Sequence, residues 1–205
     1  MESKTQTGYL VLADISGYTF FLANTELEHA NIALSYLLET MLTTLGQALT
    51  ISKLEGDAVL AYGAESQSRT GESLLKLIDQ TYRAFRDRAQ ALQAGATCPC
   101  RACEAIPSLD LKFMVHHGDF IIQHVAGIKD LLGSDVNLVH RLAKNSVATS
   151  TGWRGYALFT RSGLERSRAD QQAFVPQRES YEHLGEVETY VLDMRARYQA
   201  MKPTP

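Results

Sequence analysis

The sequence predicts an α+β fold, in which one mostly antiparallel sheet is packed against helices. Short β-rich runs are mixed with long amphipathic runs along the chain. Two β-rich stretches contain a Gly-Asp pair, at 56–57 and at 118–119, and such pairs are typical of hairpin turns. Hairpins make neighbouring strands antiparallel, which favours this class over a doubly wound parallel sheet. The common nucleotide-binding loops, G-x-G-x-x-G and Walker A, are absent from the sequence.

Length and composition indicate an ordinary globular protein. The chain has 205 residues, 45% apolar and 21% charged, so we expect one domain over residues 1–205. The net charge of −3 gives no broad attraction to nucleic acid or to an anionic membrane, and neither is expected as a partner. No apolar run approaches the roughly 18 residues of a membrane span. Asp14 interrupts the first apolar run and no cleavage pattern follows, so we expect no signal peptide and a cytoplasmic location.

The first half of the chain is expected to contain a buried strand, a helix, a hairpin and a second helix. The run at 8–15 is almost wholly apolar and rich in β-formers, which indicates the strand. Apolar residues at helical spacing follow, with Thr25 and Glu28 as a capping box and Gly46 as the stop. The other two elements of this half are a hairpin at 51–63 and an amphipathic helix at about 72–93.

The second half is expected to begin with a loop or insertion at about 95–108, because its Gly, Pro and Cys residues break any period. The apolar stretch after it indicates another hairpin, with the Gly-Asp pair at 118–119 as its tip. A helix is expected from about 135 to 147, with Ser134 as its cap. The elements expected after this helix are a strand at 156–160, a helical turn at 161–168 and strands at 173–182 and 186–193.

All three cysteines lie in the segment CPCRAC, as Cys98, Cys100 and Cys103. An odd number of cysteines without an export signal argues against a disulfide framework. The spacing C-x-C-x-x-C supplies three ligands for Zn²⁺, and a fourth would come from elsewhere, for instance a histidine or a partner chain. Two interpretations remain, of which the sequence favours the first: reduced thiols in a surface loop, or a zinc site.

Two aspartates stand at the ends of apolar runs. Asp14 ends the strand at 8–15, and Asp57 lies in the turn of the 51–63 hairpin. If this strand lies beside the hairpin, the two carboxylates face one space, where they repel each other unless a cation or a shared proton is present. Paired aspartates at strand ends can hold one or two Mg²⁺ ions over phosphates. From spacing alone, a separate turn role for each aspartate also remains open.

Four short motifs follow one another along the chain: DISGYT at 14–19, KLEGDA at 53–58, HGDF at 117–120 and D-x-x-G-x-x-V-N-x-x-x-R-L at 130–142. Each motif is weak alone. In this order, with the predicted elements between them, they resemble the class III adenylate/guanylate cyclase catalytic domain over roughly residues 8–192. The stretch HRLAKN at 140–145 and the cysteine segment indicate an outlying branch of that family.

The resemblance implies roles for the matching positions. Asp14 and Asp57 match the two aspartates that bind Mg²⁺ or Mn²⁺, and Lys53 with Asp130 matches the pair that reads the base. The amides of five consecutive residues are expected to line the triphosphate, namely Ile15, Ser16, Gly17, Tyr18 and Thr19.

Two further matches complete the implied active site. Asn137 matches the residue that orients the ribose, and Arg141 matches the one that stabilises charge in the transition state. In such cyclases the site forms between two subunits, with the metal-binding aspartates from one chain and the other groups from its partner. The resemblance therefore implies a homodimer with two sites.

The residue types suit the cyclisation of ATP to cyclic AMP and pyrophosphate. Bound divalent metal ions lower the pKa of the ribose 3′-hydroxyl and neutralise the leaving triphosphate, and the charge of an arginine suits the phosphoryl transition state. Adenine offers an acceptor at N1 and a donor at its exocyclic amine, so the donor Lys53 and the acceptor Asp130 complement it. Guanine presents the opposite pattern and leaves polar groups unpaired.

One segment departs from the family pattern. The last expected hairpin, at 180–192, contains no lysine or arginine where the family usually places a phosphate-binding lysine, and His183 lies close to that position. Because histidine is only partly protonated at neutral pH, it is a poor substitute. Two alternatives to an active cyclase follow: a regulatory module that binds a nucleotide without turnover, and an interaction domain stabilised by zinc at the three cysteines.

Overall fold

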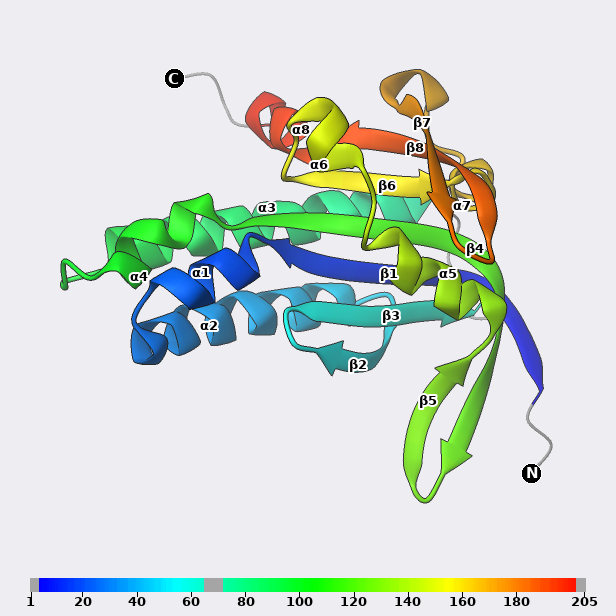
Figure 1. Ribbon diagram of the computed structural model, residues 1–205, viewed down its shortest axis with the longest axis horizontal. Coiled ribbons are helices and arrows are strands. Elements are labelled where there is room, and N and C mark those ends of the chain that lie inside the picture. Colours follow the sequence, from blue (N-terminus) through cyan, green and yellow to red (C-terminus); the bar gives the residue numbers. More distant parts are fainter. Residues whose placement is uncertain (1–3, 65–71, 202–205) are drawn as a thin grey trace.

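The computed structural model describes residues 4–64 and 72–201, and it confirms the α+β class with one open, mostly antiparallel sheet of eight strands (Figure 1). The strand order is β2-β3-β1-β4-β6-β8-β7, and β5 pairs with the far end of β4. The pair β4–β6 is parallel, and the other described pairs are antiparallel. The strands are β1 (Thr5–Ser16), β2 (Thr50–Glu55), β3 (Ala58–Ala64), β4 (Asp110–Val125), β5 (Ile128–Leu132), β6 (Tyr156–Thr160), β7 (Val175–Tyr181) and β8 (Gly185–Asp193).

Helices cover the two faces of the sheet unequally. The long helices α2 and α3 lie together on one face, whereas the short helices α5 and α6 lie on the other (Figure 1). The helices are α1 (Tyr18–Asn24), α2 (Leu27–Leu45), α3 (Glu72–Ala94), α4 (Arg101–Ala105), α5 (Ser134–Leu142), α6 (Val147–Thr151), α7 (Arg161–Ser167) and α8 (Met194–Ala200). No described helix is long and apolar enough to cross a membrane.

The alternation of side chains along β1 assigns Asp14 to a face of the sheet. Val11 and Ile15 point into the core under α2 and α3, whereas Leu10 and Leu12 pack with α5 on the opposite face. Asp14 has the same parity as Leu10 and Leu12, so it lies on the less covered α5 face. A polar side chain is tolerated there because the short helices leave part of the sheet accessible.

The expected hairpin tip at Gly118–Asp119 is wrong. Both residues lie inside β4, because the long strand β1 pairs with it through Gly8 and Thr7 at this point. A side chain at Gly118 would collide with the Asp135 carboxylate, so glycine is needed for packing rather than for a turn. The chain instead turns at Ala126–Gly127, where both residues have positive φ (50° and 83°) and fit a two-residue hairpin loop.

Three smaller expectations also need correction. Helix α2 begins after Glu26, and the hydroxyl of Thr25 donates to the Phe21 carbonyl, so the predicted capping box does not form. The predicted helix at 135–147 is divided into α5 and α6, since the chain turns after Leu142 and the side-chain amide of Asn145 donates to the Leu142 carbonyl. The loop expected at 95–108 contains helix α4 and a 3₁₀ turn.

Candidate functional site

The antiparallel pairing of β1 with β3 brings the two predicted carboxylates together. Asp14 is directly opposite Ala58, the first residue of β3, and Asp57 precedes Ala58 in the turn from β2. The amide of Ile15 donates to the Asp57 carbonyl at 3.3 Å, which fixes this turn against the end of β1. Strand register thus places Asp14 and Asp57 beside each other at one end of the sheet.

The electrostatics of this carboxylate pair favour a bound cation. Burial raises the pKa of both Asp14 and Asp57, and the charge of Asp14 raises the pKa of Asp57 further. Two acidic groups with raised pKa values are costly to ionise together, and a divalent cation removes that cost. The residues present therefore fit one or two hard cations such as Mg²⁺ or Mn²⁺.

Lys112 also belongs to this site, and the sequence reasoning missed it. Its Nζ lies 3.5 Å from Asp14 Oδ1 and donates to the Ala143 carbonyl at 3.3 Å. The Lys112 charge opposes the effect of burial on the pKa of Asp14. A lysine within the apolar run LDLKFMV is the signal that could have revealed it, because a buried strand rarely carries an unpaired charge.

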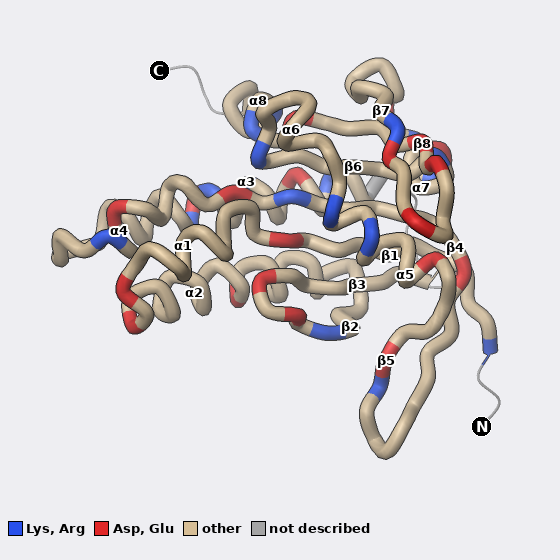
Figure 2. The backbone as a smooth tube through the Cα atoms, in the orientation of Figure 1, with Lys and Arg blue, Asp and Glu red and all other residues tan. Residues whose placement is uncertain are grey.

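The predicted base-reading residues also meet. Lys53 Nζ lies 3.1 Å from Asp130 Oδ1 and 2.8 Å from Glu55 Oε1. The hydrogen bond from Lys53 lowers the pKa of Asp130, and the bond to Glu55 is the largest of the causes that raise the pKa of Lys53. Lys53 therefore stays protonated and Asp130 ionised, as a donor and an acceptor for a base require. Acidic and basic positions follow one another along β2 and its turn (Figure 2).

A cavity of about 510 Å³ joins the predicted ribose and transition-state residues to this group. Asn137 and Arg141 line it from successive turns of α5, and both are solvent-exposed. Glu55 lines the same cavity and pairs with His140 Nδ1 at 3.3 Å, so it links the α5 residues to Lys53. The sequence reasoning missed Glu55, although its position two residues after Lys53 on one strand was the available signal.

The expected triphosphate loop is only partly free to bind a ligand. Ile15 is buried and its amide donates to the Asp57 carbonyl, so a phosphate at this amide would have to compete with that bond. Gly17 has φ of 92°, and a side chain at this position would collide with the Arg154 guanidinium. The hydroxyl of Ser16 donates to the Arg154 carbonyl at 2.7 Å. Arg154 thus adds a positive charge beside the loop that ends with Tyr18 and Thr19, and sequence reasoning gave no signal of it.

The turn between β7 and β8 supplies no strong cation to the cavity. His183 borders the cavity in a left-handed conformation with φ of 68°, and its side chain is 84% exposed. Arg178 is paired with Glu186 at 3.7 Å in the same hairpin. In the structure, therefore, the described residues of this hairpin offer no replacement for the phosphate-binding lysine of the cyclase pattern.

A family model described as "Protein of unknown function (DUF2652)" matches residues 34–151, which is more than half of the chain. Among curated proteins, the uncharacterized protein Rv2561/Rv2562 of Mycobacterium tuberculosis is 28% identical over 162 residues. That alignment covers 78% of this chain and 73% of the relative.

Solved structures similar to this fold are cyclase domains. The guanylyl cyclase Cya2 superposes with a TM-score of 0.74 at 14% identity, covering 93% of each chain. The adenylyl cyclase CyaB from P. aeruginosa gives a TM-score of 0.70 at 16% identity, covering 94% of this chain and 97% of its own. The catalytic core of a rhodopsin-guanylyl cyclase with converted specificity, in complex with ATPαS, gives 0.62 at 18% identity, covering 93% of this chain and 97% of its own. At these identities the likeness establishes a shared fold.

Proposed function

The chain belongs to the DUF2652 family of proteins of unknown function, and from this premise and its cyclase-like fold we propose that it is a nucleotidyl cyclase. The proposed reaction converts ATP to cyclic AMP and pyrophosphate. The observation that carries the proposal is the juxtaposition of Asp14 and Asp57, two acidic groups whose pKa values are raised, at the end of β1. A reaction that uses divalent metal needs both carboxylates.

The carboxylates would hold Mg²⁺ or Mn²⁺, which when bound acidifies the ribose 3′-hydroxyl and neutralises the triphosphate. Asp14 and Asp57 contribute the negative charge that positions the cations at the end of the sheet. Asn137 would hold the ribose by its side-chain amide, and Arg141 would stabilise the charge that develops on the α-phosphate as pyrophosphate leaves. Both side chains are exposed and so can reach a substrate.

Base selection would rest on Lys53 and Asp130. Their 3.1 Å contact presents a donor and an acceptor side by side, which complements N1 and the exocyclic amine of adenine. Glu55 competes for Lys53 in the absence of a substrate, and binding of adenine would have to replace part of this pairing. A purine with the opposite donor and acceptor pattern leaves both groups unpaired, which is strongly unfavourable in a closed site.

Lys112 and Arg154 would supply the positive charge that the last hairpin lacks. Lys112 reaches Asp14, and Arg154 lies over Gly17 at the start of α1, so both flank the expected triphosphate loop. A permanently charged guanidinium suits phosphate oxygens better than the exposed His183 does. This arrangement supports a phosphate site built from β4 and the segment before β6.

The proposed enzyme is a homodimer in which each site uses both chains. Asn137 and Arg141 are exposed on α5, as expected if they complete a partner's site. The hairpin of β4 and β5 exposes apolar side chains that a partner can bury: Val125 (61%), Ile128 (71%) and Leu132 (53%).

Complementation of two inactive variants tests this arrangement. Mixing Asp57→Ala with Arg141→Ala should restore about a quarter of wild-type activity, because half of the dimers are mixed and each of these keeps one complete site. Two variants of the same group, Asp14→Ala with Asp57→Ala, should not complement. Failure of the first mixture, with dimers demonstrated by light scattering, would show that each site lies within one chain.

A turnover assay tests the reaction itself. The purified protein is incubated with Mn²⁺ and, separately, ATP, GTP, CTP and UTP, and cyclic products are identified by mass spectrometry. Cyclic AMP should form, should disappear in Asp57→Ala and should persist in Glu165→Gln, a matched carboxylate change on α7. A different cyclic nucleotide would keep the mechanism and reject adenine reading by Lys53 and Asp130.

A nucleotide-binding module without turnover is the second candidate function. The exposed His183 at the cavity favours it, because a partly protonated imidazole is a weak substitute for the lysine that holds the leaving phosphates in the cyclase pattern. This candidate predicts metal-dependent ATP binding by calorimetry with no cyclic product at saturating Mn²⁺. Absence of both binding and product would reject both candidates.

A further inference from the structure

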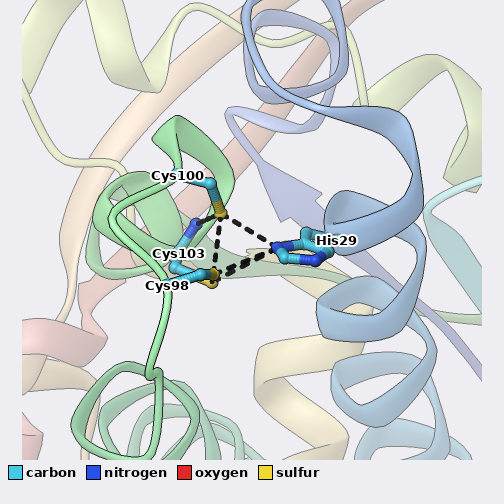
Figure 3. A group of neighbouring side chains, drawn as sticks. All are labelled: His29, Cys98, Cys100 and Cys103. Atoms are coloured by element: carbon cyan, nitrogen blue, oxygen red, sulfur yellow. Dashed lines mark hydrogen bonds between the residues drawn. The ribbon is translucent and has the colours of Figure 1, made fainter.

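The three cysteines of the segment between α3 and β4 meet a histidine from a distant part of the chain. Cys98, Cys100 and Cys103 lie around the start of α4, and His29 comes from the first turn of α2 (Figure 3). His29 and Cys98 are 69 residues apart in the sequence. One donor atom from each of the four residues lies within 4.8 Å of all the others.

The distances between these atoms match one tetrahedral metal site. The Cys98 sulfur lies 3.3 Å from that of Cys100 and 3.4 Å from that of Cys103. His29 Nδ1 lies 3.0, 3.2 and 4.0 Å from the sulfurs of Cys100, Cys98 and Cys103. For Zn–S bonds of about 2.3 Å, tetrahedral geometry places sulfurs about 3.8 Å apart. A small outward movement of the thiols would therefore accommodate the ion.

The backbone around the cysteines is shaped for thiolate ligands. Cys100 is the N-cap of α4, and its sulfur accepts a hydrogen bond from the Cys103 amide at 3.4 Å. An amide directed at a sulfur stabilises the thiolate form that binds metal. Glu26, the residue before α2, also holds this segment: its carboxylate accepts from the Ala102 amide at 3.0 Å and from Arg101 Nε at 3.3 Å. The cluster thus lies where two elements are already held together.

We infer that His29, Cys98, Cys100 and Cys103 bind one Zn²⁺ ion in a closed Cys₃His site. Three soft sulfur ligands and one imidazole nitrogen are the donor set that zinc prefers, and hard cations such as Mg²⁺ require oxygen instead. Each thiol loses its proton to solvent as the metal binds. Four protein ligands leave no open position for a substrate, so this zinc is structural.

The zinc site holds one wall of the expected triphosphate loop. Helix α4 contacts α1, α2 and α3, and α1 follows directly from Gly17. The segment continues through a 3₁₀ turn to Asp110, which pairs with Ser16 at the end of β1. An ion that fixes α4 against α2 therefore restricts the loop at 15–19. This second step rests on the proposed function, whereas the metal site does not.

Metal analysis tests the site. Protein purified with an affinity tag that does not bind metal, and without chelators, should contain one zinc per chain by elemental mass spectrometry. His29→Ala should lower bound zinc at least tenfold after dialysis, whereas His124→Ala, a matched change of an exposed histidine on β4, should retain it. His29→Cys should also retain zinc, because it replaces one suitable ligand with another.

Spectroscopy of the cobalt-substituted protein identifies the ligands. Co²⁺ in this site should give tetrahedral visible bands and thiolate charge-transfer absorption, which decreases by about a third in Cys100→Ser as one of three thiolates is lost. Three results would overturn the inference: wild-type protein without zinc, a disulfide among the three cysteines, or a cobalt spectrum that is unchanged in Cys100→Ser and in His29→Ala.

The outcomes separate this inference from the proposed function. Zinc bound by a protein that forms no cyclic nucleotide would leave the metal site standing and reject the cyclase proposal. Asp57→Ala should keep its zinc, which shows that the carboxylate pair is not the zinc site. Activity that survives zinc loss in His29→Ala would reject only the restriction of the loop.

Discussion

Two regions of this molecule gather metal-binding residue types, and they do so in different ways. The carboxylate pair, Asp14 and Asp57, is produced by strand register, since β1 and β3 are neighbours in the sheet. The thiol cluster, His29 with the three cysteines, is produced by docking of α2 against the segment before β4. The first offers hard oxygen donors beside a lysine, and the second offers three soft sulfurs and a nitrogen.

This difference predicts different roles for a metal at the carboxylate pair and for a metal at the thiol cluster. In the proposed site the carboxylate pair would supply two protein groups and leave coordination positions for a nucleotide, so its ion should exchange with the substrate. The thiol cluster supplies four ligands and closes around its ion, so that metal should stay bound through turnover. Experiments can therefore separate the proposed reaction centre from the proposed structural metal site.

The largest expected effect is on catalysis by the carboxylate pair. Asp57→Asn should lower kcat by about 10²-fold or more, because the lost charge weakens the hold on the metal in the transition state. Its zinc content and circular dichroism should match wild type, and initial-rate kinetics with Mn²⁺ provide the measurement. An unaltered kcat would show that the carboxylate pair takes no part in the reaction, and the proposed difference between the two regions would be wrong.

Chelation should distinguish the two metals by their exchange. Brief EDTA treatment should abolish cyclase activity, and Mn²⁺ or Mg²⁺ should restore it fully, while zinc remains on the protein. A thiol-reactive agent that releases zinc should instead lower Tm by about 5 °C or more, since a structural metal contributes folding free energy. Elemental analysis, differential scanning calorimetry and activity on the same samples make the comparison. If Zn²⁺ alone restored the activity, the catalytic and structural metals could not be distinguished by this treatment, and the predicted difference between them would be wrong.

The sequence was sufficient for interactions between neighbouring strands. Local patterns gave the first strand and the first hairpin but left their pairing open, and the order of the motifs, with the resemblance it carries, brought Asp14 and Asp57 together. Lys53 and Asp130 followed from motif order, although the hairpin containing Asp130 turns at Ala126–Gly127 rather than at the predicted Gly-Asp pair. That error arose because pairing with the long strand β1 outweighs the local turn preference of Gly118.

Interactions that depend on docking between distant elements were not predictable from the sequence alone. The need for a fourth zinc ligand was clear, yet nothing in the helical pattern distinguishes His29 from any other partly buried histidine. Arg154 reaches Gly17 only because the segment before β6 crosses the end of β1. Such contacts are set by three-dimensional packing and leave no periodic trace in the chain.

Base reading should show a smaller effect than metal binding. Lys53→Met should lower kcat/KM for ATP by about 10- to 100-fold and reduce discrimination against GTP, because the donor to adenine is lost. The matched control Lys76→Met, on the opposite face in α3, should behave as wild type. Competition assays with both nucleotides measure the ratio directly. Unchanged discrimination would assign nucleotide selection to another part of the cavity.

Arg154 should affect the binding of phosphates more than the chemical step. Arg154→Ala should raise KM for ATP about 3- to 10-fold and change kcat less, since one phosphate contact is lost while the carboxylates remain. Arg83→Ala, an exposed arginine on α3, is the control. An equal fall in kcat and kcat/KM would instead place Arg154 in the transition state, alongside Arg141.

The smallest expected effect is on stability, and it has opposite signs in the two regions. Burial, followed by the charge of Asp14, raises the pKa of Asp57 above 3.8, so the folded state holds a proton that the unfolded state has already lost. Ionisation of Asp57 therefore costs stability, and its contribution to the free energy of unfolding falls as the pH rises above about 4. Asp57→Asn should have a Tm close to that of wild type in acid and slightly higher near pH 7, as followed by calorimetry.

Divalent metal makes this stability difference specific to the carboxylate pair. Mg²⁺ should stabilise the wild type more than Asp57→Asn, because the ion relieves the repulsion that the asparagine has already removed. Loss of a thiol-cluster ligand in His29→Ala should lower Tm instead, because the variant loses the zinc ion that stabilises the folded state. If Asp57→Asn were less stable than wild type at neutral pH without metal, the Asp57 carboxylate would stabilise the turn between β2 and β3. The expected repulsion between the two carboxylates would then be rejected.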